Sequence, residues 1–375
     1  MKQIKSKSKS LLNLIIFSLI IIFNIKKYNP EQYFNLCNNT ILLFKKKLKK
    51  VKKPKISVIS PIHNKEKYIL RLLRSIQNQN FQSLEIIFVD DCSKDNSVGV
   101  IEKYLKEDER IIILKHKKNR GTFVSRNEGA LISKGEYLIF ADPDDILIYD
   151  IFKYSYKTAK KGNYDIVRFD GYIGNGEIIM YSLLKDIQEN RIYQPKLSLY
   201  AYYGLDGLEK FNQNDFFIWN KLIKRNIYIS SLNSINKYYI NKYIIDCEDG
   251  LMNFILYRKA KSLYYLKKAG YYYIQNEKSI TNKSKINLIK RLSSNFLYFR
   301  FVFQYSKNNY IEKNIADNIF LNVYFLIYNR KMIQYLKLVY NKNKIYEDVI
   351  NLYLSSNFIS LKTKKIMEFL KFHLN

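Results

Sequence analysis

Apolar residues follow two different periods between residues 55 and 150. Short runs with little polar interruption occupy residues 55–62, 84–91, 110–116 and 135–141, as in strands that are buried on both faces. The segments between these runs instead repeat apolar residues every three or four positions, which predicts amphipathic helices. The first of them carries such a face, and Asn64 is its expected N-cap; the face consists of Ile69, Leu72, Leu73 and Ile76.

Strand and helix alternate in units of about 25 to 30 residues, which predicts an α/β fold with a mostly parallel sheet and helices on both faces. Residues 151–280 are less regular, and GYIGNGE at 171–177 is typical of a hairpin turn. Residues 281–375 have helical spacing among Lys and Asn, and we expect basic helices that pack on the domain. We therefore expect one domain over 55–280, with halves at 55–150 and 151–280, and a basic helical C-terminal region over 281–375.

The first 54 residues are predicted to lie outside this fold. LLNLIIFSLIIIFNI, residues 11–25, is flanked by lysines on both sides. Fifteen helical residues span about 22 Å, short of the roughly 30 Å of a bilayer core. Because no cleavage pattern follows, we expect an uncleaved N-terminal anchor and a membrane-associated protein. The location would be the ER or Golgi in a eukaryote, and otherwise the cytoplasmic face of the plasma membrane.

The charge balance changes this picture little. The chain has 64 Lys and Arg against 33 Asp and Glu, a net charge of +31, and 34 Tyr. Lysine is spread along the whole chain rather than gathered, so we interpret it as a compositional bias and expect no nucleic-acid partner. Three cysteines without CxxC spacing and three scattered histidines indicate neither a disulfide framework nor a zinc site.

Acidic residues nevertheless gather at the ends of two expected strands. Asp90 and Asp91 end one strand, and Asp142, Asp144 and Asp145 follow another. Ligands of parallel sheets bind beyond the carboxyl ends of the strands, so these acids are predicted to share one edge as a site. Mg²⁺ or Mn²⁺ is commonly held by one or two carboxylates plus substrate phosphates.

Simpler roles stay open for some of these acids. Asp145 could cap a helix beginning at Ile146, and Asp95 or Asn96 could cap the helix after the first acidic pair. A pair of aspartates alone is a weak motif.

Several segments resemble the family 2 glycosyltransferases, which have a Rossmann-like GT-A fold. The resemblance is close over residues 55–150 and looser to about 275. The segments that carry it are VISPIHN, VDDCSKDNS, NRGTFVSRNEG and ADPDD, followed by FIWNKLIKR and DCEDGLMN. The resemblance implies a metal-dependent, inverting transfer of a sugar to a hydroxyl of a glycan, protein or lipid. The donor that it implies is a nucleotide diphosphate sugar, linked to UDP.

The resemblance also implies roles for individual residues. Trp219 would lie in the acceptor region. One position departs from the family: Pro143 stands between Asp142 and Asp144, where the family usually has a small residue. Proline removes a backbone N–H there but leaves both carboxylates. The other implied roles are the base pocket for Pro61, base or ribose binding for Asp90 and Asp91, nucleotide binding for Arg126, metal and diphosphate binding for Asp142 and Asp144, and general base catalysis for Asp249 beside Glu248.

Alternatives from other classes remain. A catalytically inactive relative could bind nucleotide sugars or glycans, although the intact acids argue against it. A nucleotidyltransferase would need a Gly-rich basic loop, which SPIHNKE is not. A nucleic-acid-binding protein would give no reason for acids at strand ends.

Overall fold

The computed structural model describes residues 48–174, 179–182, 191–193, 217–244 and 247–275, with a few single residues beyond. The chain divides into two compact units. The first unit is discontinuous in sequence: it runs to Tyr193 and then takes in Trp219–Asn233 and Ala260–Asn276. The second unit contains the described residues from the remaining stretches, including α9 (Lys237–Ile240) and α10 (Glu248–Lys259).

Strands and helices alternate through the first part of the first unit, as the apolar pattern predicts. Their bounds are β1 (Ile56–Ile62), α3 (Glu66–Gln77), β2 (Leu84–Asp90), α4 (Ser97–Glu102), β3 (Ile111–Lys115), α5 (Thr122–Ile132), β4 (Tyr137–Phe140), β5 (Ile146–Leu147) and α6 (Ile151–Gly162). The later elements of this unit are β6 (Ile166–Gly174), β7 (Ile179–Ser182), β8 (Arg191–Tyr193), β9 (Lys221–Lys224), α8 (Arg225–Ser234) and β10 (Leu263–Ile274).

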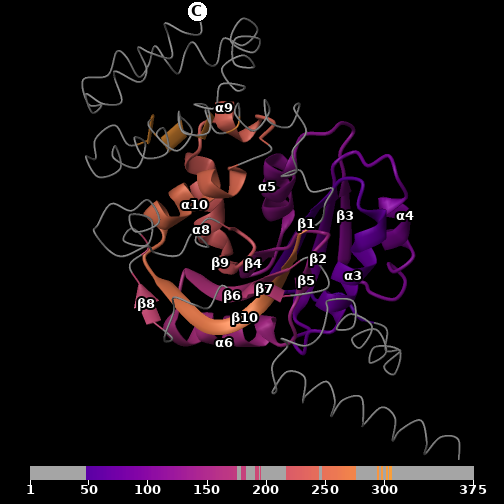
Figure 1. Cartoon of the computed structure of the whole chain (residues 1–375), viewed down its shortest axis with the longest axis horizontal. Helices are drawn as coiled ribbons and strands as arrows, with labels where there is room; N and C mark the ends of the chain where they lie inside the picture. The colour runs from indigo at the N-terminus through magenta and orange to yellow at the C-terminus, as the bar shows by residue number, and fades with distance from the viewer. Residues whose placement is uncertain are drawn as a thin grey trace, which may run out of the picture. The chain divides into compact units, whose positions relative to one another are not determined.

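Within the described residues, ten strands form one mixed sheet, drawn in Figure 1. Its main order is β3-β2-β1-β4-β9-β6-β10-β5. The first four strands in this order are parallel, and β9 is antiparallel to both of its neighbours. The prediction of a mostly parallel sheet is therefore confirmed for β1 to β4, whereas beyond β4 the sheet becomes mixed.

The centre of the sheet is covered on both faces. All seven residues of β1 and all seven of β2 are buried, which a strand achieves only when both of its faces are packed. Helix α5 packs against β1 and β2, and α6 packs against β6, β9 and β10. At Gly129 of α5, an added Cβ would lie 2.6 Å from Cγ2 of Ile59, so a glycine is needed for this close approach.

Two expected helix caps are wrong in detail. Helix α3 begins at Glu66 with Lys65 at the N-cap position, while Asn64 has a positive φ of 53° and accepts a hydrogen bond from the Lys94 N–H instead. No helix begins at Ile146, which is in β5, so Asp145 is not a helix cap.

Antiparallel pairing of β6 and β7 agrees with the predicted hairpin, but β6 continues to Gly174 and residues 175–178 lie outside the described part. The apolar segment 11–25 also lies outside it, as does nearly all of 281–375. Among the helices that the structure describes, none has both the length and the apolar character needed to cross a bilayer.

Candidate active site

The predicted acidic edge is present in the first unit. In the parallel ladder, Ile62 of β1 pairs with Asp90 of β2, and the Asp91 N–H donates to the Ile62 carbonyl. On the other side of β1, the Ala141 N–H donates to the Ile59 carbonyl, so the acidic turn that follows leaves from the carboxyl end of β4. We call residues 142–145 the acidic turn. The carboxyl ends of β2 and β4, on either side of β1, thus bring both groups of acids to one edge of the sheet.

Cations from two helices compensate the acidic turn. Arg126 of α5 donates from Nη2 to Oδ1 of Asp142 at 2.8 Å, and the two side chains are 7% and 25% exposed. Lys65, directly before α3, places Nζ 2.6 Å from Oδ2 of Asp144. Arg71 of α3 donates to the backbone carbonyl of Asp144. The two partly exposed carboxylates of the turn therefore each have a cationic partner.

Asp145 has a different environment from the other two acids of the turn. It is buried, and its carboxylate accepts hydrogen bonds from the Tyr271 hydroxyl at 2.8 Å and from the Ile274 N–H at 2.9 Å. Burial raises the pKa of Asp145 well above its ordinary value, and the nearby charges of Asp144 and Asp142 raise it further. Asp145 therefore fastens the turn to β10 rather than facing a ligand.

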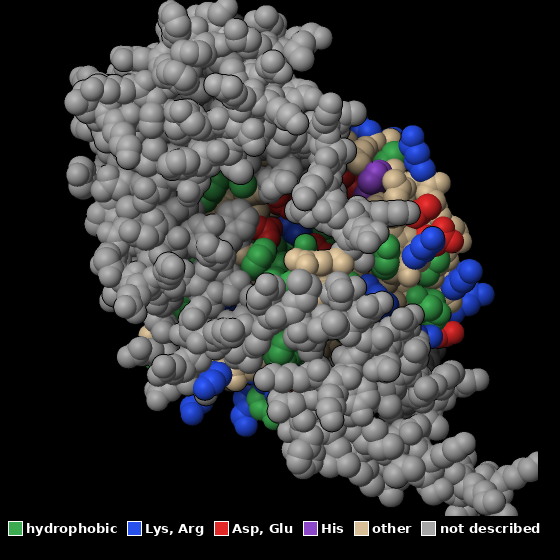
Figure 2. All heavy atoms as spheres, viewed as in Figure 1, with side chains coloured by type: hydrophobic (Ala, Val, Ile, Leu, Met, Phe, Trp, Pro, Cys, Tyr) green, Lys and Arg blue, Asp and Glu red, His purple; other side chains and the backbone are tan. Residues whose placement is uncertain are grey.

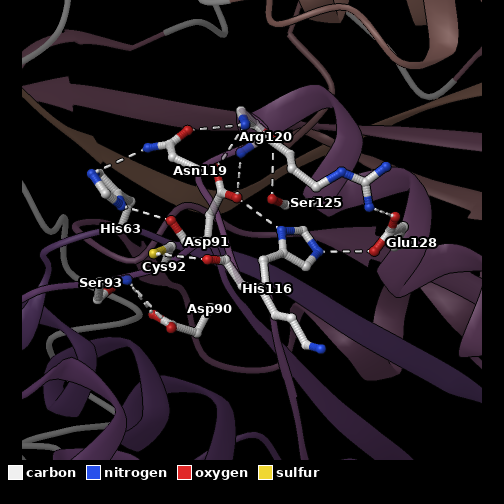
Figure 3. A network of polar contacts seen from close by, with 12 residues as sticks. His63, Asp90, Asp91, Cys92, Ser93, His116, Asn119, Arg120, Ser125 and Glu128 are labelled. Carbon is white, nitrogen blue, oxygen red and sulfur yellow. Dashed lines mark hydrogen bonds and ion pairs between the residues drawn. The ribbon is translucent and has the colours of Figure 1, made fainter.

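Asp91 is the centre of a polar network that joins β2, β3 and α5 (Figure 3). Its carboxylate accepts from the backbone N–H groups of Arg120 and Gly121, both at 2.7 Å, and lies 2.8 Å from Nδ1 of His116. His116 contacts Glu128 through its other ring nitrogen at 2.8 Å, and the Arg120 guanidinium also binds Glu128. Asp91 thus holds the loop that leads into α5, the helix that carries Arg126.

Asp90 points away from this network, as neighbouring strand residues do (Figure 3). It is buried, and both of its carboxylate oxygens lie 3.3 Å from the Ser93 N–H. A single shared N–H leaves acceptor capacity on both oxygens, whereas the Asp91 carboxylate already has three partners. Of the two acids, Asp90 is the better placed to accept a hydrogen bond from a ligand.

Pro61 lies inside β1 rather than after it, paired in register with Val89. The pairing of β1 with β4 ends at Ile59, so the missing N–H of Pro61 costs no ladder hydrogen bond on that side. Trp219 is buried, at 2% exposure, and its ring stacks on Tyr271 with centroids 4.3 Å apart.

The predicted catalytic pair belongs to the second unit. Glu248 and Asp249 begin α10, where acidic residues complement the helix dipole. Asp249 is buried, and its Oδ2 accepts a hydrogen bond from the Ile218 N–H at 3.0 Å. The structure therefore brings Asp142 and Arg126 into direct contact, places Asp90, Asp91, Asp144 and Pro61 at the same edge, and describes Asp249 and Glu248 in a separate unit.

The donor set of the acidic turn suits a hard divalent cation as part of a larger site. Asp142 and Asp144 supply carboxylate oxygens that are partly exposed, which Mg²⁺ and Mn²⁺ prefer to nitrogen or sulfur. In the described residues, no group of three or more His, Cys, Asp or Glu side chains is arranged to hold a metal ion. The two acids would supply only part of the oxygen ligands of such a cation.

Several contributors to this edge were not predicted. Lys65 and Arg71 follow the first strand, so the rule that placed the acids at the strand ends could also have indicated these cations. His116 and Glu128 gave no separate signal. Tyr271 is 129 residues away from Asp142 in a chain with 34 tyrosines, and nothing in its local sequence distinguishes it.

Figure 2 shows both signs of charge among the described side chains of one face. Among the coloured side chains there, Lys and Arg lie interspersed with Asp and Glu, most clearly over α3, α4 and β3 at the right of the view.

Known proteins resemble the chain in sequence and in fold. Residues 57–229 match the family described as "Glycosyl transferase family 2". "Glycosyltransferase GlyG" of Streptococcus pneumoniae serotype 4 is 30% identical over 178 residues, which cover 46% of this chain and 58% of that protein. "Cholesterol galactosyltransferase" of Borreliella burgdorferi is 26% identical over 312 residues, covering 73% of this chain and 81% of that protein.

A solved crystal structure has a fold similar to that of this chain. The crystal structure of S. aureus TarS 1-349 in complex with UDP-GlcNAc superposes with a TM-score of 0.59 at 19% identity, covering 85% of this chain and 88% of that one. The α/β fold is thus that of the GT-A proteins. Three curated relatives are matched over only 58%, 65% and 63% of their own length.

Proposed function

We propose that the chain, whose residues 57–229 match glycosyl transferase family 2, transfers a sugar from a nucleoside diphosphate sugar to an acceptor hydroxyl. The donor is UDP-linked, in line with the UDP-GlcNAc named for the TarS complex. The acceptor is a glycan, a protein or a lipid.

One observation carries this proposal: acidic side chains are paired with cations at the carboxyl edge of the parallel strands. Arg126 and Lys65 contact Asp142 and Asp144 at 2.8 and 2.6 Å. A diphosphate needs cations, and a divalent metal needs carboxylates; this edge offers both, because the carboxylates of the acidic turn contact cations from α5 and from the residue before α3. Mg²⁺ or Mn²⁺ bound by Asp142 and Asp144 would neutralise the departing diphosphate.

The other side chains at this edge have separate roles in the proposal. Asp90 accepts a hydrogen bond from the base or ribose, since its carboxylate has the spare acceptor capacity. Asp91 holds the loop before α5 and thereby orients Arg126 toward the acidic turn. Arg126 and Lys65 then contribute positive charge where the diphosphate lies, and an ion pair formed in advance reduces the cost of ordering them.

Asp249 is proposed as the general base that takes the proton from the acceptor hydroxyl, and a single displacement would invert the anomeric centre. This assignment rests on the DCEDGLMN segment. Asp249→Asn keeps an oxygen that accepts from the Ile218 N–H, so the substitution removes basicity while the local contact can persist. We expect turnover to fall by about 100-fold or more with little change in nucleotide affinity.

The first test is release of a nucleoside diphosphate by the full chain from a panel of nucleotide sugars, with Mn²⁺ and with EDTA. Asp142→Asn/Asp144→Asn should abolish metal-dependent release. Glu102→Gln is the matched control, because it removes a negative charge from an ion pair whose side chains are about half exposed, outside the site. Calorimetry with UDP and GDP separates the alternatives: binding without turnover on any acceptor would favour an inactive relative, and no binding would refute both.

Membrane attachment through residues 11–25 also stays a proposal. Flotation of the full chain with lipid vesicles tests it against Ile16→Lys/Ile20→Lys, which interrupts the apolar segment. Equal flotation of both proteins would contradict attachment through this segment.

A further inference from the structure

Tyr271 contacts the acidic turn at two points. Its hydroxyl donates to Oδ2 of Asp145 at 2.8 Å and accepts from the backbone N–H of Asp142 at 2.9 Å. Three residues further along β10, the Ile274 N–H donates to the other oxygen of Asp145 at 2.9 Å. The turn is therefore bound at its first and last residues by a strand from a distant part of the sequence.

The turn has few other fixed points of this kind. It connects β4 to the two-residue strand β5, and β5 pairs only through Leu147 and Ile146 with Tyr271 and Tyr272 of β10. The contacts to Lys65 and Arg126 involve side chains with several rotatable bonds. A buried phenol on a strand is more rigid, because its hydroxyl position is set by only two side-chain torsions.

The ring of Tyr271 is itself held in place. It is fully buried and stacks on Trp219, with centroids 4.3 Å apart and planes inclined by 21°. Gly171 of β6 lies against the same pair: an added Cβ would be 2.8 Å from the Tyr271 carbonyl oxygen and 3.1 Å from the Trp219 ring. The Tyr271 ring is therefore packed directly against the indole, and the backbone of β6 lies close to both residues.

We propose that Tyr271 is a positioning residue, which holds the backbone of the acidic turn so that Asp142 and Asp144 face the metal and diphosphate, and that Trp219 acts on the turn through the Tyr271 ring. The metal and diphosphate in this inference rest on the proposed function, whereas the contact of Tyr271 with the acidic turn does not. It gives Trp219 a role that its burial permits, since 2% exposure leaves little surface for a sugar.

The test compares Tyr271→Phe with Tyr272→Phe in the full chain. Tyr271→Phe keeps the stacking ring and removes both hydrogen bonds. Tyr272→Phe is the matched control, because the Tyr272 hydroxyl is buried on the next residue of β10 and has no hydrogen-bond partner in the part of the chain that the structure describes. Amide hydrogen exchange over residues 141–146, without any ligand, reports on the Asp142 N–H. Calorimetry with UDP and Mn²⁺ reports on the site.

We expect faster exchange and about tenfold weaker metal-dependent UDP binding in Tyr271→Phe, with the control unchanged in both. Equal exchange in the two variants would overturn the inference. If the wild-type chain binds neither UDP nor GDP, the proposed function fails, and exchange alone still decides whether Tyr271 holds the turn.

Trp219→Phe provides a second variant that retains the Tyr271 hydroxyl. An exchange rate between those of the wild type and Tyr271→Phe supports the link through the ring. A wild-type rate in Trp219→Phe would overturn the role given to Trp219. It also keeps the proposal testable should Tyr271→Phe fail to fold.

Discussion

Arg126 donates to Asp142 across 2.8 Å, from the first half of α5 to the turn after β4. The guanidinium is almost completely buried, whereas a quarter of the Asp142 side chain remains exposed. A ligand can therefore approach Asp142 while Arg126 stays in place behind it.

Replacing Arg126 with Met should leave the Asp142 carboxylate without its cation and remove a charge from the proposed diphosphate site. We expect kcat/KM for the best donor to fall by about 100-fold, the size typical for loss of one charge-stabilising group. Lys115→Met, which breaks a half-exposed ion pair with Glu102, is the control and should keep wild-type activity. Equal activity of the two variants would remove Arg126 from the site.

Asp90→Asn and Asp91→Asn should separate ligand binding from folding. In Asp91→Asn, an amide NH₂ would face the backbone N–H donor of Arg120 or of Gly121, and we expect a loss of about 3 kcal/mol in the free energy of unfolding. Asp90→Asn should cost less than about 1 kcal/mol because it has one backbone donor, Ser93. It should nevertheless weaken UDP binding. Urea unfolding and calorimetry on both variants decide the assignment, and the reverse pattern would exchange the two roles.

Gly129→Ala tests the close approach of α5 to the sheet. The new methyl group would meet Ile59 at 2.6 Å and Val89 at 3.2 Å, both on buried strands that cannot withdraw. We expect a loss of about 1 to 3 kcal/mol in the free energy of unfolding. Leu131→Ala, at a half-exposed position of the same helix, should stay within about 0.5 kcal/mol. A neutral Gly129→Ala would show that α5 can move outward.

Stability should decrease at alkaline pH through Tyr137. Burial, together with the nearby charge of Glu136, raises the pKa of Tyr137 from 10.0 to about 12. Between these values the unfolded chain binds fewer protons than the folded chain, so the free energy of unfolding falls as the pH rises from 10 toward about 12. Urea unfolding across this range should show a shallower decline in Tyr137→Phe. Identical slopes would contradict the prediction.

The parallel half of the fold was predictable because its signals are local. The apolar run of each strand and the three-to-four spacing of each helix come from contiguous residues, and the edge rule then placed Asp90 and Asp142 correctly on the sheet. The sequence could not show which of Asp90 and Asp91 binds the loop before α5 and which keeps acceptor capacity for a ligand, because that depends on which side of the strand faces α5. The Tyr271 contact was equally hidden, because strand pairing between β5 and β10 joins residues far apart in sequence.

The discontinuous first unit has a consequence for synthesis of the protein. Translation proceeds from the N-terminus, and Tyr271, whose hydroxyl accepts the hydrogen bond from the Asp142 N–H, lies 129 residues after Asp142. A ribosome that has just completed the parallel strands has therefore not yet made β10. Until then the sheet lacks its later strands, and the edge of β4 that pairs with β9 stays unpaired. The acidic turn can take the described form only after residue 274 has left the exit tunnel.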